Sequence, residues 1–395
     1  MEEWKIYKLG EITSKIGSGA TPKGGKDSYL GGNIALIRSQ NVLDFSFSKS
    51  GLAYINEMQA EKLNNVEVYE KDVLLNITGD SVARVCIVPN NVLPARVNQH
   101  VAIIRGNEKV DYRYLLYYLQ YIKPQLLSLS QGGATRNALT KKMIEELEIK
   151  MPSKGTQKEI VSILYTLDTK IALNRRINDN LEQQAQALFD YYFSADSKYL
   201  SDSERGVLTN IAVYLNGLAM QKFPPTDSEH SLPVLKIKEL GQGKCDNNSD
   251  RCSNDIDSNY VIDNGNIIFS WSGTLMVDVW CGGKCGLNQH LFKVTPLQDH
   301  PQWFIYYWTI RHLNTFKLIA KDKAVTMGHI KRVDLEKAEV IIPNKYSLVE
   351  MNAQIEPLYQ SIINNRLQIA ELETLRDALL PKLMSGELKI NNLNC

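Results

Sequence analysis

The sequence has few cysteines, no long apolar run and almost no net charge. Only 6 of its 395 residues are cysteine, too few for a scaffold held together by disulfides. No stretch approaches about 18 consecutive apolar residues, and residues 1–5 do not begin a secretory signal peptide. The expected location is therefore the cytoplasm. A net charge of +1 argues against non-specific binding of polyanions but is compatible with a local basic face.

Four of the cysteines, Cys245, Cys252, Cys281 and Cys285, lie in one stretch of the chain. Four thiolates could form a structural zinc site, although the first pair is more widely spaced than the usual C-x₂₋₄-C. We favour free thiols, with zinc as the alternative.

Sequence motifs for catalysis are also missing. The chain has no Asn/Asp-Pro-Pro-aromatic motif for adenine methylation and no H-E-x-x-H, and its six histidines are scattered. Residues 19–26 are glycine-rich, but they lack the G-K-[ST] ending of a phosphate-binding loop. These absences argue against a nuclease or methyltransferase that acts alone, and we expect no catalytic residues, metal or cofactor in this chain.

What the chain does contain is a globular composition and an internal repeat. Hydrophobic residues make up 44% and charged residues 23%, and 395 residues at roughly 150 per domain suggest two to three domains. Pro152 and Pro343, 191 residues apart, each end an apolar β-like run and precede a long heptad segment.

The heptad segments carry matching stripes in which spacings of four and three alternate, as in a coiled coil. The first stripe is Ile160, Leu164, Leu167, Ile171, Asn174, Asn178, Leu181, Ala185, Leu188 and Tyr192. The second is Met351, Ile355, Leu358, Ile362, Asn365, Ile369, Leu372, Arg376, Leu379 and Leu383.

One such stripe alone would favour a helix packed on its own domain, but two matched stripes favour an antiparallel helix pair. Asn174 and Asn365 occupy equivalent positions near the middle of the two segments, so we expect them to face each other and fix the register. Pro357 is expected to kink or restart the second helix, and Pro381 to loosen its last turn.

The segments that precede the helices are mixed α/β and also repeat. Strands that run into a glycine turn are expected at 72–79 and 266–273, and aromatic-rich helices at 112–127 and 302–319. The short segments 133–137 and 324–328 close the two modules. The fold class is therefore α+β, with two mixed α/β domains (1–152 and 196–343) separated by helical regions (153–195 and 344–395) in pseudo-two-fold symmetry.

Several of these patterns are those of one family. They include residues 8–12 and 17–22 at the start, the junction at 152–160, and above all residues 375–388. With the layout of domain, long helix, domain, long helix, the whole chain resembles the specificity subunit of a type I restriction-modification system. Residues 212–217 depart from the family's opening pattern, because they lack the Ser-Gly-x-Thr-Pro run.

The resemblance implies a non-catalytic DNA reader that takes part in bacterial defence. Its two target-recognition domains would read a bipartite, asymmetric site on double-stranded DNA, and its helices would dock methyltransferase subunits, expected to be two per chain, and restriction subunits with motor activity. S-adenosylmethionine, ATP and Mg²⁺ would then bind to the partner subunits and not to this chain.

Base readers must lie on loops and strand ends from which they reach the major groove. The candidates for DNA binding in the first domain are Lys23, Lys26, Arg38, Gln40, Asn41, Ser81, Arg84 and Arg136. Those in the second are Lys236, Lys238, Thr274, Lys323, His329 and Lys331. Singly, each is more often a solvated surface residue, so the prediction concerns the clusters.

An Asn-Gln-His tripeptide recurs at 98–100 and 288–290, each time before an apolar strand. We favour a shared turn in which the side chains bond to the backbone over direct contact with DNA. The alternative for the whole chain, favoured by its near-neutral charge, is a coiled-coil scaffold that joins two interaction domains without DNA readout.

Overall fold

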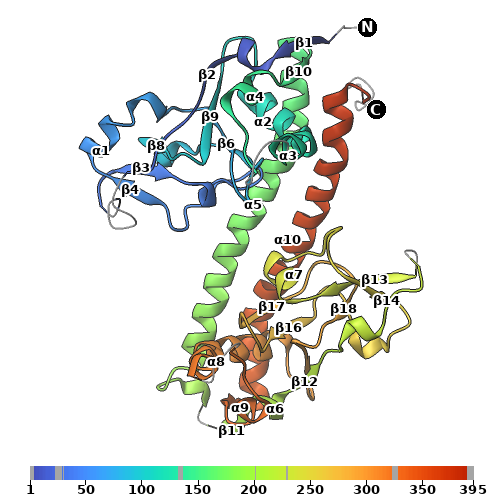
Figure 1. Cartoon of the computed structure of the whole chain (residues 1–395). Coiled ribbons are helices and arrows are strands. Elements are labelled where there is room, and N and C mark those ends of the chain that lie inside the picture. Colours follow the sequence, from blue (N-terminus) through green and yellow to red (C-terminus); the bar gives the residue numbers. More distant parts are fainter. Residues whose placement is uncertain are drawn as a thin grey trace. The chain divides into compact units, whose positions relative to one another are not determined.

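The computed structural model describes residues 4–22, 29, 31–131, 137–200, 202–227, 230–322 and 328–388. The chain forms two compact units, the first from Met1–Thr169 with Glu373–Cys395 and the second from Lys170–Leu372. Both combine sheets with helices, so the predicted α+β class is confirmed (Figure 1).

The first unit has two four-stranded sheets, in the orders β2-β9-β6-β7 and β4-β3-β8-β5, and a two-stranded sheet β1-β10. The strands are β1 (Lys5–Lys8), β2 (Thr13–Ser18), β3 (Ile34–Ile37), β4 (Ala53–Ile55), β5 (Glu67–Val68), β6 (Val73–Asn76), β7 (Val85–Ile87), β8 (Ala95–Val97), β9 (Val101–Gly106) and β10 (Glu148–Met151). Its short helices are α1 (Glu57–Glu61), α2 (Tyr112–Tyr121), α3 (Lys123–Gln131) and α4 (Lys141–Glu145).

The second unit repeats this topology, with sheets β12-β19-β16-β17, β14-β13-β18-β15 and β11-β20. The strands are β11 (Glu204–Val207), β12 (Ala212–Asn216), β13 (Ser231–Leu235), β14 (Arg251–Ser253), β15 (Val261–Ile262), β16 (Ile267–Ser270), β17 (Met276–Val279), β18 (Cys285–Leu287), β19 (Leu291–Pro296) and β20 (Glu339–Ile342). The helices are α6 (Leu208–Ile211), α7 (Ile237–Gln242), α8 (Gln302–Asp322) and α9 (Arg332–Leu335).

The strands β6 and β16 occupy equivalent places in the two domains. All four residues of each strand are buried, because each strand lies between two cores. In β6, Val73 and Leu75 face the core that contains α2, while Leu74 faces the core of the other sheet. In β16, Ile267 and Phe269 alternate with Ile268 in the same way. The predicted strands that run into glycine turns are confirmed, with Gly79 and Gly273 both at positive φ.

The predicted helix at 302–319 is confirmed as α8, but the one predicted at 112–127 is two helices, α2 and α3, that meet at Ile122. Pro124 explains the break, because a proline cannot donate the i→i−4 hydrogen bond and disfavours helical backbone at the residue before it.

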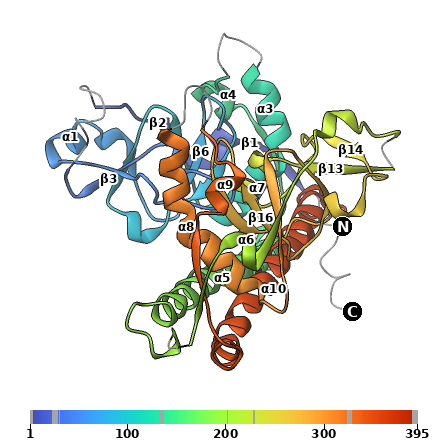
Figure 2. The same cartoon turned by 90° about the horizontal axis from the view of Figure 1, so that it is seen from below.

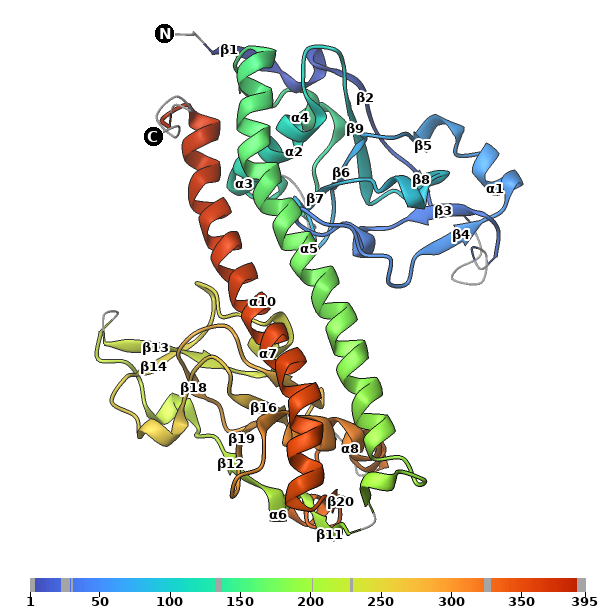
Figure 3. The ribbon, with the colours of Figure 1, turned by 180° about the vertical axis from the view of Figure 1, so that it is seen from behind.

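The two heptad segments form α5 (Lys154–Tyr192, 39 residues) and α10 (Lys345–Ser385, 41 residues), shown in Figure 3. At 1.5 Å per residue, each is about 60 Å long. All residues of both predicted stripes are buried or half-buried. The expectation that the second helix restarts at Pro357 is wrong, since α10 runs through both prolines without interruption. A kink at Pro357 and a loosened last turn at Pro381 stay predictions.

The helices pair in antiparallel fashion within each unit. In the first unit Ile160 and Leu164 of α5 share a core with Leu380 and Leu383 of α10. In the second, Ala185 and Phe189 of α5 share a core with Met351, Ile355 and Tyr359 of α10. Each long helix therefore contributes one end to each core.

The prediction that Asn174 and Asn365 face each other is wrong, because each of them bonds to another residue of the opposite helix. Asn365 donates from Nδ2 to Oδ1 of Asn178 at 2.9 Å, and Asn174 donates from Nδ2 to Oε1 of Gln368 at 2.6 Å. Asn178 also donates to the carbonyl of Ile362 at 3.1 Å. The helices are thus staggered by about one turn from the arrangement in which equivalent residues would meet.

Replacing Asn365 with Leu is expected to lower the free energy of unfolding by about 1–3 kcal/mol, because the buried Asn178 loses its donor. The double variant Asn178→Leu with Asn365→Leu should recover much of that loss, since the unsatisfied amide is removed. Urea denaturation measures both effects.

The matched control is Asn364→Leu, at an exposed position of the same helix, which should change the stability by less than about 0.5 kcal/mol. Equal losses from Asn365→Leu and Asn364→Leu would show that the bond to Asn178 does not stabilise the pair.

Candidate nucleic-acid interface

Four loops converge in each unit, and the same backbone hydrogen bonds hold them together. In the first unit they are residues 38–41, 77–84, 98–100 and 137–139, and we call them the first loop cluster. Asn98 N–H donates to the carbonyl of Ile37 at 3.0 Å, Ile77 to that of His100 at 3.0 Å, and Gly79 to that of Asn137 at 3.1 Å.

The second loop cluster consists of residues 236–238, 271–274, 288–290 and 328–331. Asn288 N–H donates to the carbonyl of Leu235 at 3.2 Å, Trp271 to that of His290 at 3.4 Å, and Gly273 to that of Gly328 at 3.0 Å. These bonds match those of the first cluster one by one, so the repeat extends to the loops.

The Asn-Gln-His tripeptides lie at the centre of both clusters. Asn98 and Asn288 are buried, and their Oδ1 atoms accept from the N–H of His100 at 3.0 Å and of His290 at 3.3 Å. The favoured structural role, a turn in which the side chain bonds to the backbone, is thus confirmed for both asparagines.

The histidines are held by hydroxyl groups that sequence reasoning missed. His100 Nδ1 lies 2.5 Å from Thr78 Oγ1, and His290 Nδ1 lies 3.1 Å from Ser272 Oγ. The signal was present in the sequence, because a hydroxyl residue occurs just before the glycine turn in both repeats. In each cluster the neighbouring glutamine amide lies beside the other ring nitrogen.

In the first cluster, Arg38 is half-buried and Gln40 is exposed. The side chains of both residues donate to the carbonyl of Gly51. The guanidinium of Arg38 also lies over the ring of Tyr29, 5.5 Å from its centroid. Ser81 and Arg84 are half-buried in the loop after β6.

Asn41 does not fit a base-reading role. It is fully buried, and its Nδ2 donates to the carbonyls of Ser48 at 2.9 Å and Ser50 at 3.3 Å. Its Oδ1 accepts from the N–H of Arg38 at 3.0 Å. Because the amide is used up inside the protein, Asn41 shapes the loop that carries Arg38, and the prediction of DNA contact is corrected.

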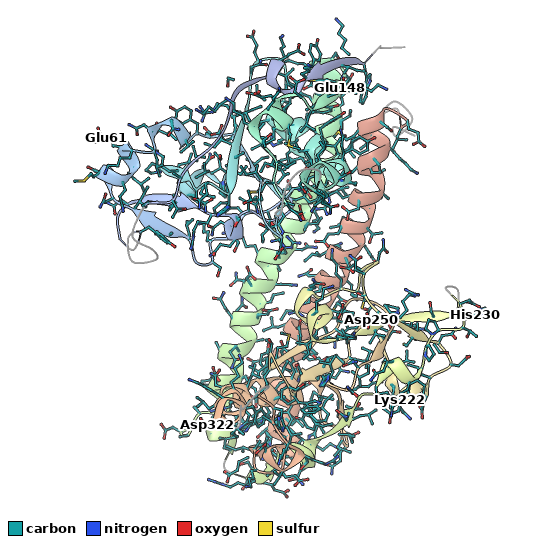
Figure 4. All side chains as sticks on the ribbon, in the orientation of Figure 1. Glu61, Glu148, Lys222, His230, Asp250 and Asp322 are labelled. Carbon is teal, nitrogen blue, oxygen red and sulfur yellow. The ribbon has the colours of Figure 1, made fainter. Side chains whose placement is uncertain are left out.

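In the second cluster, Lys238, Thr274 and Lys331 are exposed and Lys236 is half-exposed. Lys236 pairs with Asp250, which is labelled in Figure 4. His329 is half-buried, and its ring lies 6.3 Å from that of Trp271, edge to face. Lys23, Lys26, Arg136 and Lys323 lie outside the described residues.

A pocket of about 520 Å³ adjoins the second cluster. Its lining includes the two predicted lysines, Lys236 and Lys238, together with Arg251, Gln289 and His290. Arg251 and Gln289 were not among the predicted contacts. With several donors, and with Asp250 as the only acid among the described lining residues, this surface suits the acceptor-rich phosphates and base edges of DNA.

The cysteines do not gather in one place. Cys245 and Cys285 pack in one core cluster, Cys252 in a second and Cys281 against a third. Among the described residues, no three His, Cys, Asp or Glu side chains are grouped so that they could hold a metal ion. Burial raises the pKa of the Cys281 thiol to about 11.

The comparisons with known proteins agree with this architecture. The type I restriction modification DNA specificity domain matches residues 1–183 and 202–374. The chain belongs to this family.

Two specificity subunits match this chain over all or nearly all of their lengths. The type I restriction enzyme MjaIX specificity subunit of Methanocaldococcus jannaschii is 25% identical over 417 residues, which cover 99% of this chain and 95% of the relative. The HindI specificity subunit of Haemophilus influenzae is 21% identical over 471 residues, covering 98% and 100%. The resemblance found in the sequence is therefore confirmed, and these relatives indicate a non-catalytic subunit of a type I system.

A solved structure shows the same fold. The S subunit of a type I restriction-modification system from M. genitalium aligns with a TM-score of 0.59 at 12% identity, over 97% of this chain and 96% of that one. In the part of the chain that the structure describes, no helix has the length and apolar character needed to cross a membrane.

The two neighbours in the first tripeptide should behave differently on substitution. Asn98→Ala is expected to lower the free energy of unfolding by about 1–2 kcal/mol, because it removes a buried bond to the backbone. Gln99→Ala, at an exposed side chain, should change it by less than about 0.5 kcal/mol. Equal effects in thermal or urea denaturation would argue against the structural role of Asn98.

Proposed function

We propose that this chain is the specificity subunit of a type I restriction-modification complex that reads a bipartite, asymmetric DNA target. The first loop cluster would read one half-site and the second loop cluster the other. The observation that supports this most directly is the matched pair of clusters, in which equivalent backbone bonds carry different exposed side chains.

The chemistry of the exposed side chains supports DNA as the ligand. Arg38 and Gln40 in the first cluster can pair with guanine and adenine respectively, and Lys236 and Lys238 in the second can bind phosphate or guanine. Since similar scaffolds present different groups, the two half-sites should differ in sequence. The two clusters would contact half-sites about one helical turn apart on the duplex.

The long helices would dock the partner subunits. Methyltransferase subunits, expected to be two per chain, and restriction subunits would bring the catalytic residues, and S-adenosylmethionine, ATP and Mg²⁺ would bind to them. The assembled complex would then act as an adenine-specific methyltransferase and a restriction endonuclease, with this chain as its non-catalytic reader.

Single substitutions in the two clusters should each affect one half-site. Gln40→Ala is expected to relax the preference at the half-site read by the first cluster by about 1–3 kcal/mol per base pair, and Thr274→Ala to act on the other half-site alone. Both side chains are exposed, so neither variant should unfold the protein. Selection of bound duplexes from randomised DNA by the complex with its methyltransferase measures the preference at every position.

Gln184→Ala, at an exposed position of α5, serves as the control and should leave both half-sites unchanged. If Gln40→Ala and Thr274→Ala relaxed the same positions, the assignment of one cluster to each half-site would be wrong.

A scaffold without DNA readout is the second candidate, and the net charge of +1 favours it. The two candidates differ in their salt dependence. For a DNA reader, the logarithm of the DNA-binding constant of the complex falls linearly with the logarithm of the salt concentration. If Lys238 binds a phosphate, Lys238→Ala should reduce the slope of this line by about one. A complex without any sequence preference on randomised DNA would favour the scaffold.

A further inference from the structure

A second pocket, of about 630 Å³, lies within the second unit, and none of its lining residues belongs to the second loop cluster. It is lined by the last turns of α5, by α8 and by α10, which pack together in one core (Figure 2). Three carboxylates, Asp179, Glu182 and Asp190, line it, with Arg366 as the only basic lining residue among those described. We call it the acidic pocket.

The charges in the acidic pocket are only partly balanced. Arg366 donates to Glu182 at 2.8 Å and to Asp278 at 2.5 Å, so its charge is already shared by two carboxylates. Asp190 accepts only from the neutral amide of Gln186, at 3.1 Å, and within the described residues the carboxylate of Asp179 has no partner. The pocket therefore favours a cation and repels the phosphates of DNA.

The walls of the pocket are aromatic. Tyr306, Tyr307 and Tyr359 line it, and burial raises the pKa of all three hydroxyls, which stay protonated at neutral pH. The hydroxyl of Tyr359 is buried without a hydrogen-bond partner in the described part of the chain. Aromatic faces beside carboxylates suit a guanidinium, which is planar and stacks on rings while it donates in its own plane.

The first unit shows which side chain comparable surroundings hold there. The repeat of 191 residues relates Asp168 to Tyr359 and Arg376 to Ala185. In the first unit Arg376 donates to Asp168 at 2.9 Å, and Tyr117 donates to the same carboxylate at 2.6 Å. The guanidinium of Arg376 lies under the ring of Phe45, 3.8 Å from its centroid.

The second unit has alanine where the first has this arginine. Ala185 is fully buried and does not line the acidic pocket, so the first unit serves as an example of how a guanidinium binds beside a carboxylate and aromatic rings. We propose that an arginine side chain of the methyltransferase subunit enters the acidic pocket, which makes the pocket a docking site for that subunit. This inference rests on the proposed function, and it adds the place and the chemistry of the contact.

The proposal is tested with the full-length chain and the methyltransferase subunit of the same restriction-modification system. Asp179→Lys reverses a charge in the pocket, and Ala187→Trp fills the pocket from an exposed position on its rim. Each is expected to weaken binding of the methyltransferase subunit by about tenfold or more, as measured by titration calorimetry or sedimentation.

The matched controls lie outside the pocket at exposed positions of the same helices. Glu371→Lys makes the same change of charge as Asp179→Lys, and Gln184→Trp places the same bulky side chain at an exposed position of α5. Both should alter binding by less than about twofold. Melting curves of all four variants should coincide with that of the unmodified chain.

A photo-crosslinking residue at position 187 gives a second readout that does not depend on weakened binding. It should capture the methyltransferase subunit at a peptide that contains arginine, whereas the same residue at position 184 should not. If the unmodified chain binds the methyltransferase but the pocket variants bind within about twofold of it, or the crosslink at 187 captures no methyltransferase, the inference is overturned and the proposed function stands. If the unmodified chain does not bind the methyltransferase at all, both fail.

Discussion

The antiparallel contact between α5 and α10 is the interaction on which the two units depend. Neither recognition domain closes its core with its own strands and short helices. The first takes Leu380 and Leu383 from the far end of α10, and the second takes Ala185 and Phe189 from the far end of α5. A substitution at a stripe residue that belongs to one of these cores, such as Leu164 or Ile355, therefore acts on a domain core and on the helix pair at once.

Polar residues within the contact determine how the helices align. An apolar stripe tolerates small shifts, whereas a buried amide must find a partner at a particular place. Asn178 bonds at once to Asn365 and to the carbonyl of Ile362, and Asn174 to Gln368. Ion pairs continue the pattern on either side, with Glu182 and Arg366 in the second unit and Asp168 and Arg376 in the first.

Much of the fold follows from periodicity in the sequence. The heptad stripes, the strands β6 and β16 with their glycine turns, and the repeat itself are local patterns, and all of them occur in the structure. The stagger of the helices could not be predicted from the sequence, because a stripe defines the face of each helix but not its axial position against the other helix. The break before Pro124 could have been read from the sequence, whereas the uninterrupted passage of α10 through Pro357 depends on packing.

The candidate sites were less predictable, because they depend on contacts between distant segments. Asn41 belongs to a residue type that reads adenine, but its burial is decided by the loop at 48–51, to which its amide bonds. Arg251 became a candidate only when folding brought it into the same pocket as Gln289. The acidic pocket could not be predicted for the same reason, since Asp179, Tyr306 and Arg366 are distant in sequence and line one pocket only after folding.

The discontinuous make-up of the first unit has a consequence for biosynthesis. A ribosome releases domains in order from the N-terminus, and most fold in that order. Here the second unit, Lys170–Leu372, has emerged completely before the segment that supplies Leu380, Leu383 and Met384 to the first. The domain translated first thus completes its core last, and its apolar surface stays open to chaperones until that segment has emerged.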